Sequence, residues 1–382
     1  MEKINLFIDG HVLDETNQGT STFIRGLYLA LAKKYPAVTV CIGICSRETV
    51  LKEVELFKYC KPVYYKAKNK YFRLLIDVPI IIRKYNIDYA HFQYFTPLVK
   101  NCKWIVTIHD LLFNDFPKEF PFFYKVIRNI LFYISLFRSD IKTTVSEYSK
   151  KTIIRDFKIK ESLINVIPNA VDPYFFINHQ DKAMLKVVIK KYDLKNYILF
   201  VSRIEPRKNH IILARAFYDL QLDKKGYQLV FVGRKSIHVS ELESFINSIP
   251  EDRRVCLRRL ESIPNNELQY LYKGARLFIY PSKGEGFGIP PLEAAVTGIP
   301  TLCSNATAMK DYSFFDDCFF NPNDIEELKQ KITDNLNRND EVNIRRKKEI
   351  ILNKYNWTKS ATELMRLIEI ESERSINENS NS

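Results

Sequence analysis

Residues 281–300 read PSKGEGFGIPPLEAAVTGIP and directly follow the apolar run LFIY at 277–280. The apolar run predicts a buried strand, and the glycines at 284, 286 and 288 predict a loop whose backbone can approach a ligand closely. PPLEAAV predicts a helix that begins at its two prolines. Glu285 falls in the loop and Glu293 in the helix. Backbone N–H groups gather where such a helix begins, so the stretch predicts a site for an anionic or polyhydroxyl ligand.

The same alternation of short apolar strands and amphipathic helices runs through the whole chain. It occurs twice, and the candidate strands are 4–8, 38–45, 89–93, 104–108, 141–145 and 163–167 in the first half, then 197–201, 228–232, 255–258, 277–280 and 301–303. Nearly continuous apolar strands between helices are typical of parallel sheets covered on both faces. The predicted fold class is therefore α/β, with two doubly wound Rossmann-like domains and ligands at the carboxyl ends of the strands, in a cleft between the domains.

The length of 382 residues favours more than one domain. We expect an N-terminal domain over 1–180, facing acceptor and membrane, and a C-terminal domain over 190–355. We expect an amphipathic helix over 356–372 to return to the first domain, and a disordered polar tail over 373–382.

The net charge of +13 is concentrated in the first half, where residues 51–160 carry 21 Lys and Arg against 10 Asp and Glu. No zinc-finger spacing, basic heptad helix or RNP-type motif accompanies it, which argues against nucleic acid. The stretch FPFFYKVIRNILFYISLFRS at 120–139 has an apolar helical stripe interrupted by Lys125, Arg128 and Arg138. It predicts either an interfacial helix on an anionic membrane or a core helix with a solvated edge.

Polar and charged residues follow the predicted strands of both halves. Gly19 lies in the loop after the first strand, His109 follows the strand at 104–108, and Arg203 and Lys208 follow the strand at 197–201. Two cations near a helix start suit a diphosphate. The sequence has no GxGxxG after the first strand of either half, no P-loop and no Asp-x-Asp motif, which disfavours NAD, an NTPase of the P-loop class and a metal-held diphosphate. The seven cysteines show no metal-ligand spacing.

Five segments together resemble retaining glycosyltransferases of family four, which have the GT-B fold. EGFGIPPLEA matches the E-x7-E signature, and VSRIEPRKN, TIHDL, TVSEYSK and VIPNAVD match further family segments in the right order. Ser202 and Ala170 stand where many members have glycine, and SNATAMKD lacks the usual late Glu, for which Asp311 is the candidate replacement. These departures bear on the identity of the donor rather than on the reaction class.

The resemblance implies a role for each matching residue. Glu293 would hold the ribose of a nucleotide sugar, and Glu285 would hold the sugar together with the backbone of Gly286, Phe287 and Gly288. Arg203 and Lys208 would bind the pyrophosphate and stabilise the leaving nucleoside diphosphate. His109 would approach the transferred sugar, and Gly19 would let its loop approach the phosphates or acceptor. The catalytic set is thus predicted to be His109, Glu285, Arg203 and Lys208, with no metal and no cofactor.

We therefore expect a cytoplasmic enzyme, peripheral at the inner face of the cell membrane. It would transfer a sugar, with GDP-mannose as the candidate donor, to a hydroxyl of a lipid-linked glycan in bacterial surface polysaccharide synthesis. The expected partners are the nucleotide sugar, the glycan or lipid-linked acceptor and an anionic membrane, without nucleic acid. Two alternatives stay open: a sugar-nucleotide epimerase of the same fold, and a non-catalytic membrane-associated binder of nucleotide sugars.

Overall fold

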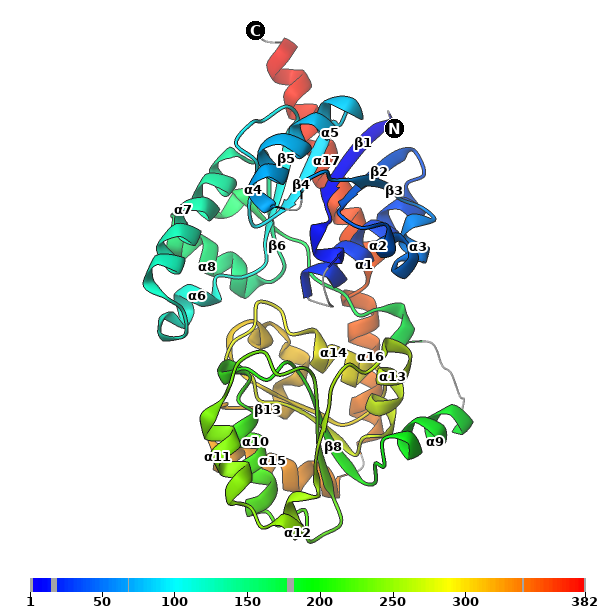
Figure 1. The fold of residues 1–382 in the computed structure, drawn as a ribbon, viewed down its shortest axis with the longest axis vertical. Coiled ribbons are helices and arrows are strands. Elements are labelled where there is room, and N and C mark those ends of the chain that lie inside the picture. The colour runs from blue at the N-terminus through cyan, green and yellow to red at the C-terminus, as the bar shows by residue number, and fades with distance from the viewer. Residues whose placement is uncertain (1–2, 15–18, 68, 177–181, 339, 381–382) are drawn as a thin grey trace. The chain divides into compact units, whose positions relative to one another are not determined.

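The chain folds as two compact units, shown in Figure 1 as a computed structural model. Residues 3–14, 19–67, 69–176, 182–338 and 340–380 are described. Unit 1 comprises Met1–Ala170 and Tyr355–Ser382, and unit 2 comprises Val171–Lys354. Unit 2 begins before the expected end of the first domain at residue 180, and residues 182–191 form a helix that packs within unit 2. The predicted fold class is confirmed, since each unit is built on a parallel sheet.

Unit 1 has a seven-stranded parallel sheet in the order β3-β2-β1-β4-β5-β6-β7. Its strands are β1 (Ile4–Asp9), β2 (Val38–Ile44), β3 (Lys61–Tyr64), β4 (Tyr89–Gln93), β5 (Lys103–Ile108), β6 (Ile141–Thr144) and β7 (Ile164–Val166). Most positions of β1, β2, β4 and β5 are buried, because helices cover both faces of the sheet. Trp104, Phe7 and Phe92 are fully buried in one core cluster against it.

The helical elements of unit 1 are mostly short. They are η1 (His11–Leu13), α1 (Gly19–Lys34), α2 (Arg47–Lys52), α3 (Val54–Phe57), α4 (Lys70–Phe72), the π-helical η2 (Arg73–Asp77), α5 (Val78–Lys84), α6 (Leu112–Asp115), η3 (Pro117–Glu119), α7 (Phe122–Arg138), α8 (Glu147–Phe157), η4 (Glu161–Leu163) and α17 (Trp357–Ser380). No helix among the described residues combines the length and the apolarity needed to cross a bilayer.

Unit 2 has a six-stranded parallel sheet in the order β10-β9-β8-β11-β12-β13. Its strands are β8 (Tyr197–Val201), β9 (Gln228–Val232), β10 (Leu257–Leu260), β11 (Leu277–Tyr280), β12 (Thr301–Ser304) and β13 (Phe319–Phe320). Its helical elements are η5 (Pro173–Phe175), α9 (Lys182–Lys191), η6 (Pro206–Lys208), α10 (His210–Asp219), α11 (Ser240–Ser248), α12 (Glu251–Arg254), α13 (Asn265–Gly274), α14 (Ile289–Val296), η7 (Thr307–Asp311), η8 (Ser313–Cys318), α15 (Ile325–Asn337) and α16 (Glu341–Lys354). Strand β11 lies inside this sheet, so the loop after it emerges at the carboxyl edge.

The last helix, α17, packs on α1 of unit 1 (Figure 1). At Gly26 of α1 the helices approach so closely that a Cβ atom would overlap the indole ring of Trp357. Further along, Ser360 Oγ donates to the carbonyl of Pro168 at 2.8 Å, and Lys103 Nζ lies 2.9 Å from Glu371 Oε1. Helix α17 continues to Ser380, through most of the segment for which a disordered tail is expected; residues 381 and 382 lie outside the described residues.

Candidate active site

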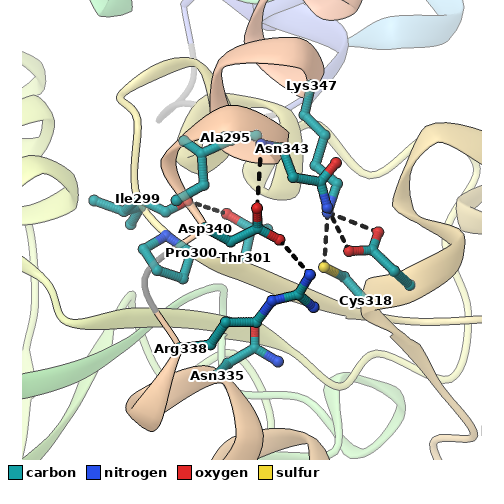
Figure 2. Close-up of a pocket in the computed structure, with 12 residues that line it drawn as sticks. Ala295, Ile299, Pro300, Thr301, Cys318, Asn335, Arg338, Asp340, Asn343 and Lys347 are labelled. Atoms are coloured by element: carbon teal, nitrogen blue, oxygen red, sulfur yellow. Dashed lines mark hydrogen bonds and ion pairs between the residues drawn. The ribbon is translucent and has the colours of Figure 1, made fainter.

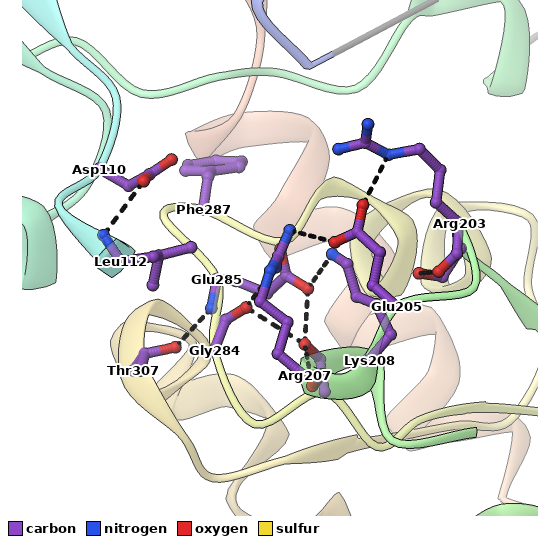
Figure 3. Close-up of polar contacts among 12 residues, drawn as sticks. Asp110, Leu112, Arg203, Glu205, Arg207, Lys208, Gly284, Glu285, Phe287 and Thr307 are labelled. Carbon is purple, nitrogen blue, oxygen red and sulfur yellow. Dashed lines mark hydrogen bonds and ion pairs between the residues drawn. The ribbon is translucent and has the colours of Figure 1, made fainter. Parts of the chain in front are cut away.

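The loop between β11 and α14 presents Glu285 in a buried polar setting at the carboxyl edge of the unit 2 sheet (Figure 3). The residue is only 8% exposed. Its Oε1 accepts hydrogen bonds from Ser282 Oγ at 2.7 Å and Tyr280 Oη at 2.9 Å, and it pairs with Lys208 Nζ. The backbone N–H of Glu285 donates to Thr307 Oγ1 at 2.8 Å. The carboxylate is therefore fixed in position from several sides.

Two cations compensate the buried charge of Glu285. Lys208, on η6, forms a buried ion pair with it, and Arg207 Nη1 lies 3.7 Å from Oε2. Burial alone would raise the pKa of Glu285, but these charges and the hydrogen bonds hold it at about 2. Glu285 is thus ionised at any physiological pH, and it is held as a hydrogen-bond acceptor.

The start of α14 explains why the loop, rather than the helix, must supply backbone donors. Pro290 and Pro291 lack an N–H, so two of the positions that usually offer free donors at a helix start offer none. Gly288 has a φ of +87°, which an L side chain rarely adopts, and a Cβ there would lie 3.1 Å from Met309 Sδ. The glycine therefore permits the tight turn from loop to helix. The Phe287 carbonyl accepts from Tyr312 Oη at 2.6 Å, which fixes the neighbouring peptide.

Glu293 lies on α14 and differs electrostatically from Glu285. Its Oε2 accepts a hydrogen bond from Tyr272 Oη at 2.8 Å. Burial raises the pKa of Glu293 to about 7, and the hydrogen bond from Tyr272 only partly opposes the rise. No cation forms an ion pair with Glu293 among the described residues. The two glutamates of one motif thus have opposite pKa shifts because only one of them has cations beside it.

Arg203 follows β8 and has a side chain that is 54% exposed. Its Nε lies 3.3 Å from Glu205 Oε1, and Arg207 Nη2 lies 2.9 Å from Glu205 Oε2. Glu205 therefore holds two arginines beside the loop (Figure 3). Sequence reasoning did not assign Glu205 or Arg207 to the site. Their alternating charges in SRIEPRKN were the available signal, and the chain topology places them at the same sheet edge as Glu285.

Two predicted site residues belong to unit 1, and their approach to a donor stays a prediction. His109 follows β5 and is 6% exposed, with Nε2 2.7 Å from Gln93 Oε1. Burial lowers its pKa to about 3, so the imidazole is neutral. Gly19 is the exposed first residue of α1, and a Cβ there would meet no atom within 4 Å. Gln93 was missed because a lone glutamine in an apolar strand carries no sequence signal.

A small cavity of unit 2 has the wrong place and size for a nucleotide (Figure 2). It is lined by Pro300 and Thr301 at the amino end of β12, and its volume is about 20 Å³. Lys347 Nζ lies 2.8 Å from both Asp317 Oδ1 and Cys318 Sγ there. Because ligands of parallel sheets bind at the carboxyl edge, this cavity is structural and the Glu285 loop is the candidate site.

Comparisons with known proteins cover both units. Residues 17–175 match the family model "Glycosyltransferase Family 4", and residues 181–357 match "Glycosyl transferases group 1". The "O-antigen chain mannosyltransferase B" of Escherichia coli is 29% identical over 61% of this chain and 61% of its own length. The "O-antigen chain mannosyltransferase RfbU" of Salmonella typhimurium is 27% identical over 60% of this chain and 59% of its own length. The chain thus aligns with about three fifths of each of these relatives.

The fold is also found among solved structures. A crystal structure titled as a glycosyltransferase from Rickettsia africae superposes with a TM-score of 0.69 and 19% identity, over 98% of this chain and 99% of that one. At this identity the match bears on the fold alone. It agrees with the architecture of two parallel-sheet units described above.

Proposed function

Since the chain belongs to glycosyltransferase family 4 and has the GT-B fold, we propose that it transfers a sugar from a nucleotide donor to a glycan hydroxyl with retention of configuration. The observation that carries this proposal is Glu285, a buried carboxylate kept ionised by Lys208 and Arg207 beside a glycine loop. An ionised carboxylate in a fixed position accepts hydrogen bonds from vicinal hydroxyls. Glu293, one turn into α14, is the candidate acceptor for the ribose.

The cations beside the loop support a metal-independent reaction. Arg203, Arg207 and Lys208 all follow β8 and can neutralise a diphosphate by themselves. As the bond to the sugar breaks, negative charge grows on the departing diphosphate, and these side chains stabilise it. In the front-face mechanism proposed for this family, the same phosphate helps to deprotonate the acceptor. Lys208 would then exchange part of its contact with Glu285 for the phosphate.

We propose GDP-mannose as donor and a lipid-linked glycan of a surface polysaccharide as acceptor. The donor rests on the two relatives that are named O-antigen mannosyltransferases. The test is mass spectrometry after incubation with a panel of nucleotide sugars and lipid-linked acceptors extracted from cells. A product one hexose heavier is expected with wild type and with Glu241→Gln, an exposed control on α11. It should be lost with Glu285→Gln.

The same experiment separates the alternatives. Release of a free or epimerised sugar without acceptor would identify an epimerase. Binding of nucleotide without any turnover in the whole panel would identify a non-catalytic binder. Neither result is compatible with the proposed transferase.

We further propose that unit 1 docks on an anionic membrane at the cytoplasmic face. Only Phe132, Ser135 and Leu136 of α7 are buried. Phe122 is 69% exposed and Phe123 is 77% exposed, so the apolar stripe is not a core face. Each Lys or Arg near an anionic surface contributes about 1 kcal/mol, and the attraction decays within a Debye length.

Vesicle co-sedimentation tests the docking. Wild type should pellet with anionic vesicles at low salt and dissociate at high salt, whereas the double variant Phe122→Ser/Phe123→Ser should pellet poorly. Val342→Ser is the matched control, because Val342 is an 83% exposed apolar residue on α16 of unit 2. Equal pelleting with neutral and anionic vesicles would exclude electrostatic docking.

A further inference from the structure

Unit 1 contains an apolar cavity of about 340 Å³ that the proposed donor chemistry does not use. It lies between the segment 70–75 of α4 and η2, the residues that follow β4, and one face of α7. Its apolar lining includes Leu74, Leu75, Phe95, Leu98, Ile127 and Leu131. All of these belong to unit 1, so the cavity is a property of that unit alone.

The hydroxyl of Ser135 in the lining is already hydrogen-bonded to the backbone. Ser135 Oγ accepts from the backbone N–H of Thr96 at 3.0 Å and donates to the carbonyl of Leu131 at 2.8 Å. This hydroxyl therefore offers little to a polar ligand, and the apolar part of the wall suits an apolar one.

Two cations and no carboxylate line the cavity. The guanidinium of Arg128 lies 4.5 Å from the centroid of the Tyr124 ring and 5.5 Å from that of Phe95. Lys70 Nζ lies 5.0 Å from the Tyr71 ring. Neither cation has an ion-pair partner within the part of the chain that the structure describes. The aromatic rings hold the cations in place and leave their N–H groups available to an anion.

The cavity is open to the surface through exposed apolar residues. Tyr71 is 62% exposed, Leu98 is 61% exposed and Leu75 is 44% exposed. An engineered apolar cavity of about 150 Å³ holds one benzene molecule, so this volume corresponds to a chain segment of about a dozen carbon atoms. That is enough for the first part of one hydrocarbon chain, whose remainder would extend beyond the opening, and too little for two chains.

We propose that this cavity binds the hydrocarbon chain of a single-chain lipid phosphate, with the phosphate against Arg128 and Lys70. The inference rests on the proposed function, because it identifies the lipid part of the acceptor. A single chain matches the volume, and an anionic head group matches two cations without a carboxylate. A two-chain phospholipid matches neither the single cavity nor its size.

Calorimetry with geranylgeranyl phosphate below its critical micelle concentration tests whether the cavity binds the hydrocarbon chain. Leu131→Trp fills the cavity and should weaken binding at least tenfold. Val126→Trp is the matched control, because Val126 and Leu131 both lie on α7 and are both 39% exposed, but only Leu131 lines the cavity. Equal binding by the two variants, or no saturable binding to wild type, would overturn the proposal. So would a dimer that forms in wild type and is lost only in Leu131→Trp.

A second variant tests the head group. Arg128→Gln should lower the affinity for geranylgeranyl phosphate by about one to two decades, because a hydrogen bond to a charged group is lost. The affinity for the uncharged geranylgeraniol should be unaffected. Equal weakening of both probes would mean that Arg128 only shapes the cavity. The single-chain assignment would be refuted if a short two-chain phosphatidylglycerol bound as tightly as geranylgeranyl phosphate and if Leu131→Trp weakened that binding.

Donor binding is measured in parallel with GDP and UDP. It should be unchanged in Leu131→Trp, which also verifies that the variant is folded. If wild type binds geranylgeranyl phosphate but transfers no sugar from any donor, the proposed function fails and the lipid site stands. If transfer to the lipid-linked acceptor is intact in Leu131→Trp, the lipid site fails and the proposed function stands.

Discussion

Glu293 should make the affinity for the donor depend on pH near neutrality. Burial raises its pKa from 4.5 to about 7, so the empty site is half protonated at neutral pH. Ribose hydroxyls donate hydrogen bonds, and the ionised carboxylate accepts them better than the protonated acid. Binding should therefore favour the ionised form, weaken as the pH falls and release a proton at pH 6.

The magnitude follows from the ionised fraction. With a pKa of about 7, this fraction falls from about nine-tenths at pH 8 to about one-tenth at pH 6, so the apparent affinity should fall about tenfold. The nucleotide has its own phosphate pKa of about 6, which acts in the same direction. Glu293→Gln keeps the shape and the partner Tyr272 but does not titrate, so the difference between the two proteins isolates the carboxyl group.

Calorimetry with the nucleoside diphosphate at pH 6, 7 and 8, in two buffers of different ionisation enthalpy, measures both the affinity and the released proton. Wild type should lose about ten times more affinity than Glu293→Gln between pH 8 and pH 6. Parallel pH profiles for the two proteins would refute the assignment of Glu293 to the ribose. They would leave the role of Glu285 untouched.

The remaining predictions concern stability and metal ions. Lys208→Met leaves Glu285 buried beside a more distant Arg207, and it should lower the free energy of unfolding by about 3–5 kcal/mol. The double variant Lys208→Met/Glu285→Gln should recover much of this loss in urea unfolding. No recovery would mean that Lys208 acts mainly through packing. Gly26→Ala should destabilise the α1–α17 contact by about 1–3 kcal/mol in thermal unfolding. Gly19→Ala should not, because a Cβ at position 19 meets no atom within 4 Å. Equal stability of the two variants would argue against the close helix contact. Sugar transfer should survive EDTA, and loss that Mg²⁺ or Mn²⁺ restores would overturn the metal-free proposal.

Sequence analysis located most of the strands, and the continuous apolar ones were the plainest. LFIY and YILFV are buried at nearly every position, so their character is visible without the fold. Strand β3, KPVY at Lys61–Tyr64, was missed because it is short, contains proline and lies at the edge of its sheet with exposed ends. The predicted strand at 255–258 is shifted to Leu257–Leu260, since residues 251–254 form a helical turn that delays it.

The candidate site was predictable where its residues lie together in one segment of the sequence. Glu285 and Glu293 share a glycine loop and the helix that follows it, and this pattern drew attention to both. Their opposite pKa shifts were not predictable, because the cations beside Glu285 come from η6, more than seventy residues earlier in the chain. The apolar cavity of unit 1 also escaped sequence analysis, because it joins side chains from three segments that only the sheet order of unit 1 brings together.

The place of α17 has a consequence for how the protein is made on the ribosome. Unit 1 is discontinuous: its sheet is complete by residue 166, but the helix that covers α1 is synthesised only after all of unit 2. Gly26 and the apolar face around it must therefore remain uncovered while almost two hundred further residues emerge. Unit 2 is contiguous and can fold as soon as it leaves the exit tunnel, so it should be the first unit to reach its native state, although it is encoded second. Until then, nascent unit 1 is the segment most exposed to chaperones and to aggregation.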